Sequence, residues 1–555
     1  MSSYTIGLDY GTNSVRGLLV EIGTGVEVSS SVFEYPHGDA GILTDSRDPH
    51  IARQHPQDYI DGAVAVITGV LAAAASHAGF SPDQVVGIGV DTTGSTPIPV
   101  DGEGTPLAFL PEFADNLNAM AVLWKDHTGY AEAAEITALA AQIRPEYLKK
   151  CGGIYSAEWF WAKILRNLRA APDVYEKAYT WVEHADWLPA LLCGTTHPDR
   201  LKRGICAAGH KGLYGTWWGG FPDSEFLAAL DPKLVRVGES LPTKTYHVGE
   251  AAGTLGEEWA KLTGLSAGIP VSIGAFDAHL GAIGAGITPG TLVKIIGTST
   301  CDLMVSPLSE DLGDIPGLCG IVPESILPNY YGLEAGQSAV GDIFNWYVKS
   351  IQPGKLDHEQ LTEGAARLQP GESGLLALDW HNGNRTVLVD QRLTGGVLGL
   401  TLQTTPEELY RAWVEATAFG ARVIMERLEE YGQSVERIIN CGGIAAKNPM
   451  VMQIYADIMG RPIYISSSNQ TCALGAAICG AVAAEAYKSF DVATAEMTSL
   501  QPRTFVPDPE RRARYDRLFE LYRKVHDAFG VKGASGELYD VMKDLLTLRE
   551  EVRHV

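Results

Sequence analysis

Residues from Asp9 to Arg16 read DYGTNSVR and directly follow a short apolar run. Gly11 lets the backbone approach a ligand because it has no Cβ, and Thr12 and Asn13 add donors of the kind that bind phosphate. Asp9, at the end of the run, could hold Mg²⁺ through water, and Arg16 is predicted to point back towards the turn. An ordinary hairpin turn explains the segment equally well, so both interpretations stay open.

A second Gly-Thr turn, Gly297 and Thr298, lies between the apolar runs TLVKII and CDLMV. Two such turns facing each other would hold a polyphosphate from both sides, although turns favour glycine and small polar residues in any case. The repeat suggests two related lobes, which we place on either side of Gly274. Gly442 and Gly443 follow another apolar run, and a glycine pair gives a flat adenine ring access to the backbone.

Asp277 is a candidate general base. Phosphoryl transfer depends mainly on positioning and charge, and a hydroxyl nucleophile needs a group that accepts its proton. Asp277 follows the apolar run from Ile269 to Ile273, in a segment rich in glycine and alanine where a substrate could come close. An N-cap of the next helix is the alternative, and the residues alone favour it.

Several classes of protein lose support because their motifs are absent. The sequence holds no G-x-x-x-x-G-K-[ST], no G-x-G-x-x-G after a strand, no H-E-x-x-H and no G-x-S-x-G. The net charge of −24 disfavours a nucleic-acid partner. Eight cysteines without a C-x-x-C pair indicate reduced thiols and a cytoplasmic protein. No apolar run is long enough to span a membrane, so no membrane partner is expected.

The pattern of apolar residues predicts an α/β fold. An opening antiparallel meander is followed by strands and helices that alternate in the second half, and charged amphipathic helices follow from Asp508 to Val555. The predicted strands are 4–9, 15–21, 26–34, 85–91, 291–296, 301–305, 435–441 and 462–466, and the predicted helices are 56–78, 406–431, 449–459 and 474–487.

The segment DYGTNSVR resembles the first phosphate-binding hairpin of the actin, Hsp70 and sugar-kinase superfamily. Over nearly its full length the chain resembles the FGGY carbohydrate kinases, with further matches at EWFWAK, GAFDAH, CGGIAAKN and QIYADIMG. This resemblance implies a two-lobed, actin-like (ribonuclease H-like) ATPase fold with an interlobe cleft. Residues 1–274 would form the sugar-binding lobe, and 275–555 the nucleotide-binding lobe with its C-terminal helices. The chain departs from many relatives in carrying Gln470 before Thr471, where they have Glu-Thr.

The same resemblance implies roles for individual residues. Asp277 becomes favoured as base, although it could also cap its helix, and Asp9 would hold the metal. The expected sugar-binding residues are Thr96, Trp124, Lys125, Asp126, Lys211 and Glu334. The expected ATP-binding residues are Gly11, Thr12, Asn13, Arg16, Gly297, Thr298, Gly341, Asn345, Gly442, Gly443 and Asn448. Structural alternatives stay open for four of these: core packing for Trp124, a solvated pair for Lys125 and Asp126, and a helix-surface amide for Asn345.

Four loops, TTGSTP, LWKDH, AGHKG and YGLEAG, resemble those of family members that act on L-ribulose. They imply that ATP, with Mg²⁺, phosphorylates L-ribulose on O5 in arabinose breakdown, in a chain that could form a homodimer. The alternatives are a kinase of D-ribulose, xylulose or a pentitol, and an actin- or Hsp70-like ATPase without sugar kinase activity. Closure of the lobes about residues 274–290 and the last helices would exclude water from the reaction.

Overall fold

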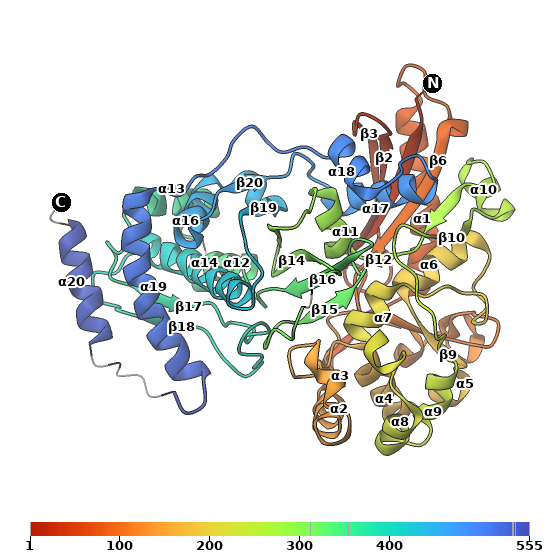
Figure 1. Cartoon of the computed structure of the whole chain (residues 1–555), viewed down its shortest axis with the longest axis horizontal. Helices are drawn as coiled ribbons and strands as arrows, with labels where there is room; N and C mark the ends of the chain where they lie inside the picture. The colour runs from red at the N-terminus through yellow and green to blue at the C-terminus, as the bar shows by residue number, and fades with distance from the viewer. Residues whose placement is uncertain (1, 311, 353, 535–537, 539, 554–555) are drawn as a thin grey trace.

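Two mixed sheets, one in each half of the chain, organise the molecule (Figure 1). The computed structural model describes residues 2–310, 312–352, 354–534, 538 and 540–553. The first sheet has the order β10-β11-β6-β1-β2-β3, with β12 also paired to β6, and the second has the order β15-β16-β14-β13-β19-β20. The strands of the first sheet are β1 (Tyr4–Tyr10), β2 (Ser14–Glu21), β3 (Glu27–Glu34), β6 (Val85–Thr92), β10 (Ala251–Thr254), β11 (Pro270–Ser272) and β12 (Ala275–Phe276); those of the second are β13 (Thr291–Ile296), β14 (Thr300–Pro307), β15 (Gly320–Pro323), β16 (Tyr330–Ala335), β19 (Arg437–Cys441) and β20 (Ile463–Ile465).

The central strands β1 and β6 run parallel and read as almost continuous apolar runs, because both of their faces are covered. Helix α17 (Thr471–Ala483) covers them, although it comes from the far end of the chain. Gly7 and Gly89 make this possible, since a Cβ on either would overlap the backbone of α17. A helix from the C-terminal half of the sequence therefore covers the sheet of the N-terminal half.

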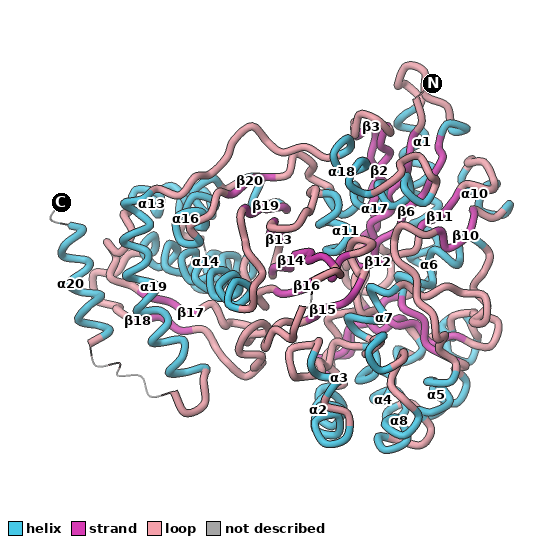
Figure 2. The backbone as a smooth tube through the Cα atoms, viewed as in Figure 1, coloured by secondary structure: helices cyan, strands magenta, loops and turns pink. Residues whose placement is uncertain are grey.

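Helix α11 (Asp277–Gly284) packs against α17 and joins the two sheets, since it also contacts β13 and β14. Gly284 and Gly475 bring the two helix backbones close together, because a Cβ on either would overlap the partner helix. The buried apolar residues form one large core in the second half, two in the first half, and another around α11 and α17. Figure 2 shows the same pair of helices between the two groups of strands.

The remaining helices cover the sheets and extend the two halves. In the first half these are α1 (Pro56–Ala74), α2 (Tyr130–Ile143), α3 (Glu146–Lys149), α4 (Phe160–Ala170), α5 (Pro172–Lys177), α6 (His184–Cys193), α7 (Ile205–Lys211), α8 (Ser224–Leu230), α9 (Leu234–Glu239) and α10 (Glu257–Thr263). In the second half they are α12 (Gly341–Trp346), α13 (His358–Arg367), α14 (Pro406–Glu430), α15 (Gly443–Lys447), α16 (Pro449–Met459), α18 (Phe490–Met497), α19 (Pro509–Gly530) and α20 (Val541–Arg553). Small sheets are formed by β4 (Leu43–Asp45), β5 (Asp48–Gln54) and β8 (Ala121–Val122), by β7 (Pro97–Val100) and β9 (Thr180–Glu183), and by β17 (Leu376–Leu378) and β18 (Gly396–Leu398).

The long helix α14 begins at Pro406 as predicted and ends at Glu430, one residue before the predicted limit. Thr405 is its N-cap, and the Thr405 hydroxyl and the Glu408 carboxylate each accept a hydrogen bond from the other's backbone N–H. Gly432, with φ 85°, follows its end. The prediction for α1 extends four residues too far, because residues 75–78 turn back and His77 N donates to the Ala74 carbonyl.

Other limits differ in smaller ways. Helix α17 begins three residues earlier than predicted, at Thr471, and ends at Ala483 rather than at Tyr487. Gly442 and Gly443 are not a simple turn, because Gly442, with φ 96°, is the N-cap of the short helix α15. In the predicted charged tail, α19 and α20 are present, whereas positions 535–537, 539, 554 and 555 lie outside the described residues.

The chain passes from the first sheet to the second through α11, between Phe276 and Thr291. The predicted division after residue 274 stays a prediction. None of the helices in the described part of the chain combines the length and the apolar character needed to cross a membrane.

Candidate functional site

Three aspartates gather at one edge of the first sheet. Asp9 and Asp91 occupy paired positions of the parallel strands β1 and β6. Strand β12 pairs with the same end of β6, Phe276 opposite Thr92, and Asp277 follows immediately. The carboxyl ends of adjacent parallel strands lie at the same edge, where open α/β sheets bind their ligands. We call Asp9, Asp91 and Asp277 the carboxylate edge.

The carboxylate edge is short of positive charge. Burial raises the pKa of Asp91 well above its usual value, and the charges of Asp9 and Asp277 raise it further. Burial, followed by the Asp9 charge, raises the pKa of Asp277 to about 7. Burial also raises the pKa of Asp9, although Arg16 opposes the shift. Crowded carboxylates of this kind favour either a bound cation or a shared proton.

Asp277 is the first residue of α11, and Phe276, not Asp277, occupies the N-cap position. The Asp277 Oδ1 nevertheless accepts a hydrogen bond of 2.6 Å from Ala278 N, one residue further along. This contact fixes the carboxylate at the start of the helix. The sequence-based alternative of an N-cap is therefore wrong in its position, although the side chain does bind a backbone N–H.

A buried ion pair joins the two halves of the chain beside Asp277. Lys211 Nζ, at the end of α7, lies 2.9 Å and 3.1 Å from the two carboxylate oxygens of Glu334 on β16. Burial alone would raise the pKa of Glu334, but the Lys211 ammonium lowers it well below its usual range. Burial alone would lower the pKa of Lys211, but the Glu334 carboxylate raises it above its usual value. We call this pair the lobe bridge.

The loop after β6 is held by a second buried cation. Lys163 Nζ, on α4, donates to the carbonyls of Ser95, Leu123 and, at 3.3 Å, Val122. Thr96, which is fully buried, donates its N–H to Glu183. Lys163 therefore fixes the loop that carries Thr96 together with the segment that leads to Trp124, which explains part of the EWFWAK motif.

The tip of the first hairpin contacts the segment that follows β8 directly. Trp124 Nε1 donates a hydrogen bond of 3.0 Å to the Thr12 hydroxyl, so Trp124 is more than packing in the core. Gly11 N donates to the Ser14 carbonyl across the turn, and the Asn13 side chain donates to Ala40 O. The Asn13 side-chain amide is therefore already engaged, and the tip would bind a phosphate mainly through backbone N–H groups.

Asp126 is fully buried, which contradicts the alternative of a solvated pair with Lys125. It forms an ion pair with Arg53. Its Oδ2 accepts from Ala52 N, and its Oδ1 accepts from the N–H and hydroxyl of Thr128. These contacts occupy both carboxylate oxygens, and the Lys125 side chain is half-buried beside it.

The second hairpin tip is tied to α12. The carbonyl of Thr298 accepts from Val340 N, and that of Gly297 accepts from Gly341 N at 3.1 Å. Gly341 is required by this close approach, because a Cβ there would overlap the Gly297 carbonyl. Gly442 is required in the same way, by the carbonyl of Ile296.

Gly297 and Gly443 differ from these two glycines. No atom lies within 4 Å of a Cβ placed on Gly443, and the first neighbour of one placed on Gly297 is 3.9 Å away. Space for a ligand therefore remains above both. Asn345 is half-buried on α12, while the Asn448 side chain caps α16 and donates to Thr362.

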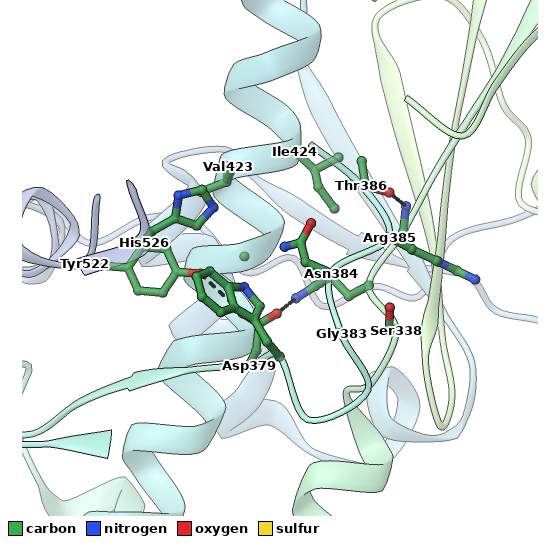
Figure 3. A pocket seen from close by; sticks show the side chains of 14 residues that line it. Ser338, Asp379, Gly383, Asn384, Arg385, Thr386, Val423, Ile424, Tyr522 and His526 are labelled. Carbon is green, nitrogen blue, oxygen red and sulfur yellow. Dashed lines mark hydrogen bonds between the residues drawn. The ribbon is translucent and has the colours of Figure 1, made fainter. Parts of the chain in front are cut away.

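A half-buried arginine, Arg385, lies near Glu334 of the lobe bridge, and the sequence did not indicate it. Arg385 donates to the carbonyl of Thr300 on β14, and burial lowers its pKa less than Cys301, Cys319, Glu158 and Glu334 raise it. Figure 3 shows its guanidinium pointing away from Tyr522 and His526, across a polar pocket where Gln337 donates to Asp379.

Most predicted site residues therefore lie around the carboxylate edge, the lobe bridge and the two hairpin tips, with Arg16 exposed on β2. Sequence reasoning missed Asp91, Lys163, Arg385 and two histidines beside Glu334. Asp91 had a signal, because VVGIGVD repeats the pattern of an apolar strand that ends in aspartate, as in TIGLD.

The chain is similar to known proteins over nearly its whole length. Residues 4–284 match the sequence profile of the N-terminal domain of the FGGY family of carbohydrate kinases, and residues 292–484 match its C-terminal domain. A protein named Ribulokinase from Vibrio parahaemolyticus is 43% identical over 544 residues, covering 94% of this chain and 95% of the relative. A Ribulokinase from Mycolicibacterium smegmatis is 41% identical over 569 residues, covering 99% and 98%.

Solved structures share the fold at lower identity. The xylulose kinase of Rhodospirillum rubrum superposes with a TM-score of 0.78 at 24% identity, covering 95% of this chain and 98% of the other. The glycerol kinase of Plasmodium falciparum with ADP gives a TM-score of 0.77 at 16% identity, covering 96% and 99%. The expected two-lobed α/β kinase fold is confirmed.

Proposed function

Because this chain belongs to the FGGY family of carbohydrate kinases, we propose that it transfers the γ-phosphoryl group of ATP to O5 of L-ribulose, as a step of arabinose breakdown. The choice of sugar is supported by two relatives named Ribulokinase, which are 41% and 43% identical over nearly the whole chain. The observation that carries the chemistry is the position of Asp277, at the carboxylate edge and beside the lobe bridge.

We assign Asp277 as the general base. A pKa of about 7 lets this carboxyl accept a proton near neutral pH and release it again. As the O5–phosphorus bond forms, the O5 proton passes to the Asp277 carboxylate, and the bond to the β,γ-bridging oxygen breaks to leave ADP. Asp277 needs no covalent intermediate, since this transfer depends on positioning and charge stabilisation.

The lobe bridge is assigned to sugar binding. A carboxylate and an ammonium held at fixed distance offer acceptors and donors to vicinal hydroxyls. Trp159 and Phe276 place their rings 5.2 Å and 5.7 Å from Lys211 Nζ, which surrounds the charge with apolar surface. Thr96 and Trp124 are assigned to sugar binding as well. Lys125 and Asp126, which is paired with Arg53, support the segment that carries Trp124.

The hairpin tips are assigned to ATP. The backbone N–H groups of Thr12, Asn13 and Thr298 face phosphate oxygens in this proposal, and the open space above Gly443 receives the adenosine. Gly11 and Gly297, whose own N–H groups donate to the carbonyls of Ser14 and Ser299, let the phosphates approach the two tips. Asn345 would border the purine, Arg16 would support the first tip, and Gly341, Gly442 and Asn448 shape the nucleotide side from behind.

Mg²⁺ fits the carboxylate edge. Neither oxygen of the fully buried Asp91 accepts a hydrogen bond from an N–H or hydroxyl donor among the described residues, and burial raises the pKa of both Asp9 and Asp91, so a bound cation would stabilise their charged forms. Asp9, supported by Asp91, would hold the ion, which supplies positive charge to the transferring phosphoryl group.

A coupled ADP assay tests this function across L-ribulose, D-ribulose, L-xylulose, D-xylulose, ribitol, L-arabitol and glycerol. We expect L-ribulose to give the highest kcat/KM, and phosphorus–proton correlation NMR to show the new phosphate on O5. A different best sugar would overturn the assignment of L-ribulose. No rise in ADP release with any sugar over ATP alone would overturn the kinase function.

Location and assembly complete the proposal. All eight cysteines are free in the structure, which suits the reducing cytoplasm. A homodimer is one possible assembly, and sedimentation velocity tests it: a single species of monomer mass would exclude it.

A further inference from the structure

Two buried histidines lie against the Glu334 carboxylate. His210 Nδ1, on α7, is 3.2 Å from Glu334 Oε2, and His279 Nε2, on α11, is 3.7 Å from the same oxygen. The two imidazole rings meet edge to face, with centroids 4.6 Å apart. One donor atom from each of the three residues lies within 4.8 Å of the other two. Three separate elements thus bring two imidazoles and a carboxylate together.

The histidine nitrogens that face Glu334 have no other partner. Neither ring nitrogen of His279 makes a hydrogen bond to a described residue, and His210 Nδ1 makes none that meets hydrogen-bond geometry. His210 Nε2 lies 3.0 Å from the Ser325 hydroxyl, which donates its own proton to the Val322 carbonyl. Ser325 therefore accepts from Nε2–H, and the lone pair of His210 is left on Nδ1, towards Glu334. A hydrogen bond from the ring nitrogen that faces away from the metal typically orients a metal-binding histidine.

The charge states suit a cation as well. Burial lowers the pKa of His279 to about 4 and that of His210 well below its usual value, so both rings are neutral at pH 7. Glu334 is ionised, since the Lys211 ammonium lowers its pKa against the effect of burial. Metal ligation needs this form of each group, a neutral imidazole and a charged carboxylate.

We propose that His210, His279 and Glu334 form a binding site for a divalent transition cation such as Zn²⁺. A tetrahedral ion with bonds of about 2.0–2.1 Å separates its ligand atoms by about 3.4 Å. Glu334 Oε2 lies at similar distances from the two histidine nitrogens, 3.2 Å from His210 Nδ1 and 3.7 Å from His279 Nε2. Imidazole donors select Zn²⁺, Cu²⁺ or Ni²⁺ over Mg²⁺ and Ca²⁺, which prefer oxygen ligands. This site is therefore chemically distinct from the carboxylate edge.

The cation and the sugar would exclude each other. Glu334 also holds Lys211, at 2.9 Å and 3.1 Å, and a divalent ion on the same carboxylate would weaken that pair. The exclusion rests on the proposed function, because it requires that the lobe bridge binds the sugar. The metal site itself depends only on the three side chains.

Equilibrium dialysis of the purified full chain against Zn²⁺, with Mg²⁺ as the comparison ion, tests the site. We expect one Zn²⁺ per chain, with at least about tenfold weaker binding in His279→Gln and in His210→Gln. His526→Gln is the matched control, because His526 is also buried and has an unpartnered ring nitrogen, but lies in the other polar pocket. This variant should bind Zn²⁺ as the unmodified chain does.

Co²⁺ binding provides a second readout. It uses the unmodified chain, so misfolding of a variant cannot affect the result. Nitrogen and oxygen ligation gives ligand-field bands without thiolate-to-metal charge transfer, which separates this site from the eight free cysteines. Thiolate bands, equal Zn²⁺ binding by His279→Gln, or the absence of Zn²⁺ binding would each overturn the metal site. If L-ribulose fails to displace bound Zn²⁺, the exclusion is wrong and the metal site stands; if L-ribulose is no substrate, Zn²⁺ binding is still measured.

Discussion

The carboxylate edge and the lobe bridge are neighbours, since Lys211 and Glu334 both affect the pKa of Asp277, yet their charges are arranged in opposite ways. Asp9, Asp91 and Asp277 lie at one edge of one sheet, and burial raises the pKa of each of them. The neighbouring carboxylates raise the pKa values of Asp91 and Asp277 further. Lys211 and Glu334 come from different halves of the chain and carry opposite charges, so each stabilises the charged form of the other. The first arrangement favours uptake of a proton or a cation, and the second favours a fixed geometry.

The largest expected effect is that of Asp277→Asn. Removal of the base should lower kcat for L-ribulose by about 10²–10⁴-fold, because the amide of asparagine cannot accept the O5 proton. The KM for L-ribulose should change little, since the lobe bridge is intact. Steady-state ADP release measures both values, and Asp115→Asn, at an exposed aspartate, is the matched control. Near-normal turnover in Asp277→Asn would refute the assignment of the base.

The lobe bridge should respond in stability and in sugar binding. Glu334→Gln leaves the Lys211 ammonium buried without its counter-charge, which costs about 3–5 kcal/mol of unfolding free energy. The double variant with Lys211→Met should recover part of that loss. Urea unfolding followed by circular dichroism provides the measurement.

The exposed pair Lys233–Glu176 is the control for that prediction, because both side chains are 57% exposed. Lys233→Met should cost about 0–1 kcal/mol. Equal losses for the buried and the exposed pair would remove the basis for treating the lobe bridge as a fixed element.

A smaller effect is expected in the pH dependence of kcat/KM. Asp277 acts in its deprotonated form, and its raised pKa of about 7 means that this form is lost as the pH falls through 7. The rate should therefore rise with pH up to about 7 and then level off, with a slope of about tenfold per pH unit on the acid side. Glu334, with a lowered pKa, should add no step above pH 5. A profile that is flat from pH 5 to 8 would contradict the raised pKa of Asp277.

The smallest effect concerns the hydrogen bond between Thr12, at the tip of the first hairpin, and Trp124. Trp124→Phe and Thr12→Val each remove the same 3.0 Å hydrogen bond, which is worth about 1 kcal/mol, or about fivefold in kcat/KM. Because the bond is shared, the double variant should lose little more than either single variant. Additive losses would show that the two side chains act separately.

Much of the carboxylate edge could be predicted from the sequence. The runs TIGLD and VVGIGVD each end an apolar strand with aspartate, and parallel pairing alone brings Asp9 and Asp91 together. The hairpin tips and α14 with its Thr405 cap follow from local patterns in the same way, since nearby residues determine them.

The lobe bridge could not be paired from sequence by physical reasoning. Lys211 and Glu334 are separated by 123 residues and meet only when both lobes are folded. Glycines pose a similar difficulty: Gly341 and Gly442 are required by contacts with the chain's own backbone, whereas Gly297 and Gly443 leave open space. Local sequence does not distinguish these two uses of glycine.

Calorimetric titration of L-ribulose into Asp277→Asn and Lys211→Met tests most directly whether chemistry and binding are divided between the two regions. The account predicts that Asp277→Asn binds L-ribulose within about threefold of the unmodified chain while it turns over at least about 10²-fold more slowly. Lys211→Met should bind L-ribulose at least about tenfold more weakly. Loss of binding in Asp277→Asn together with unchanged binding in Lys211→Met would contradict the account.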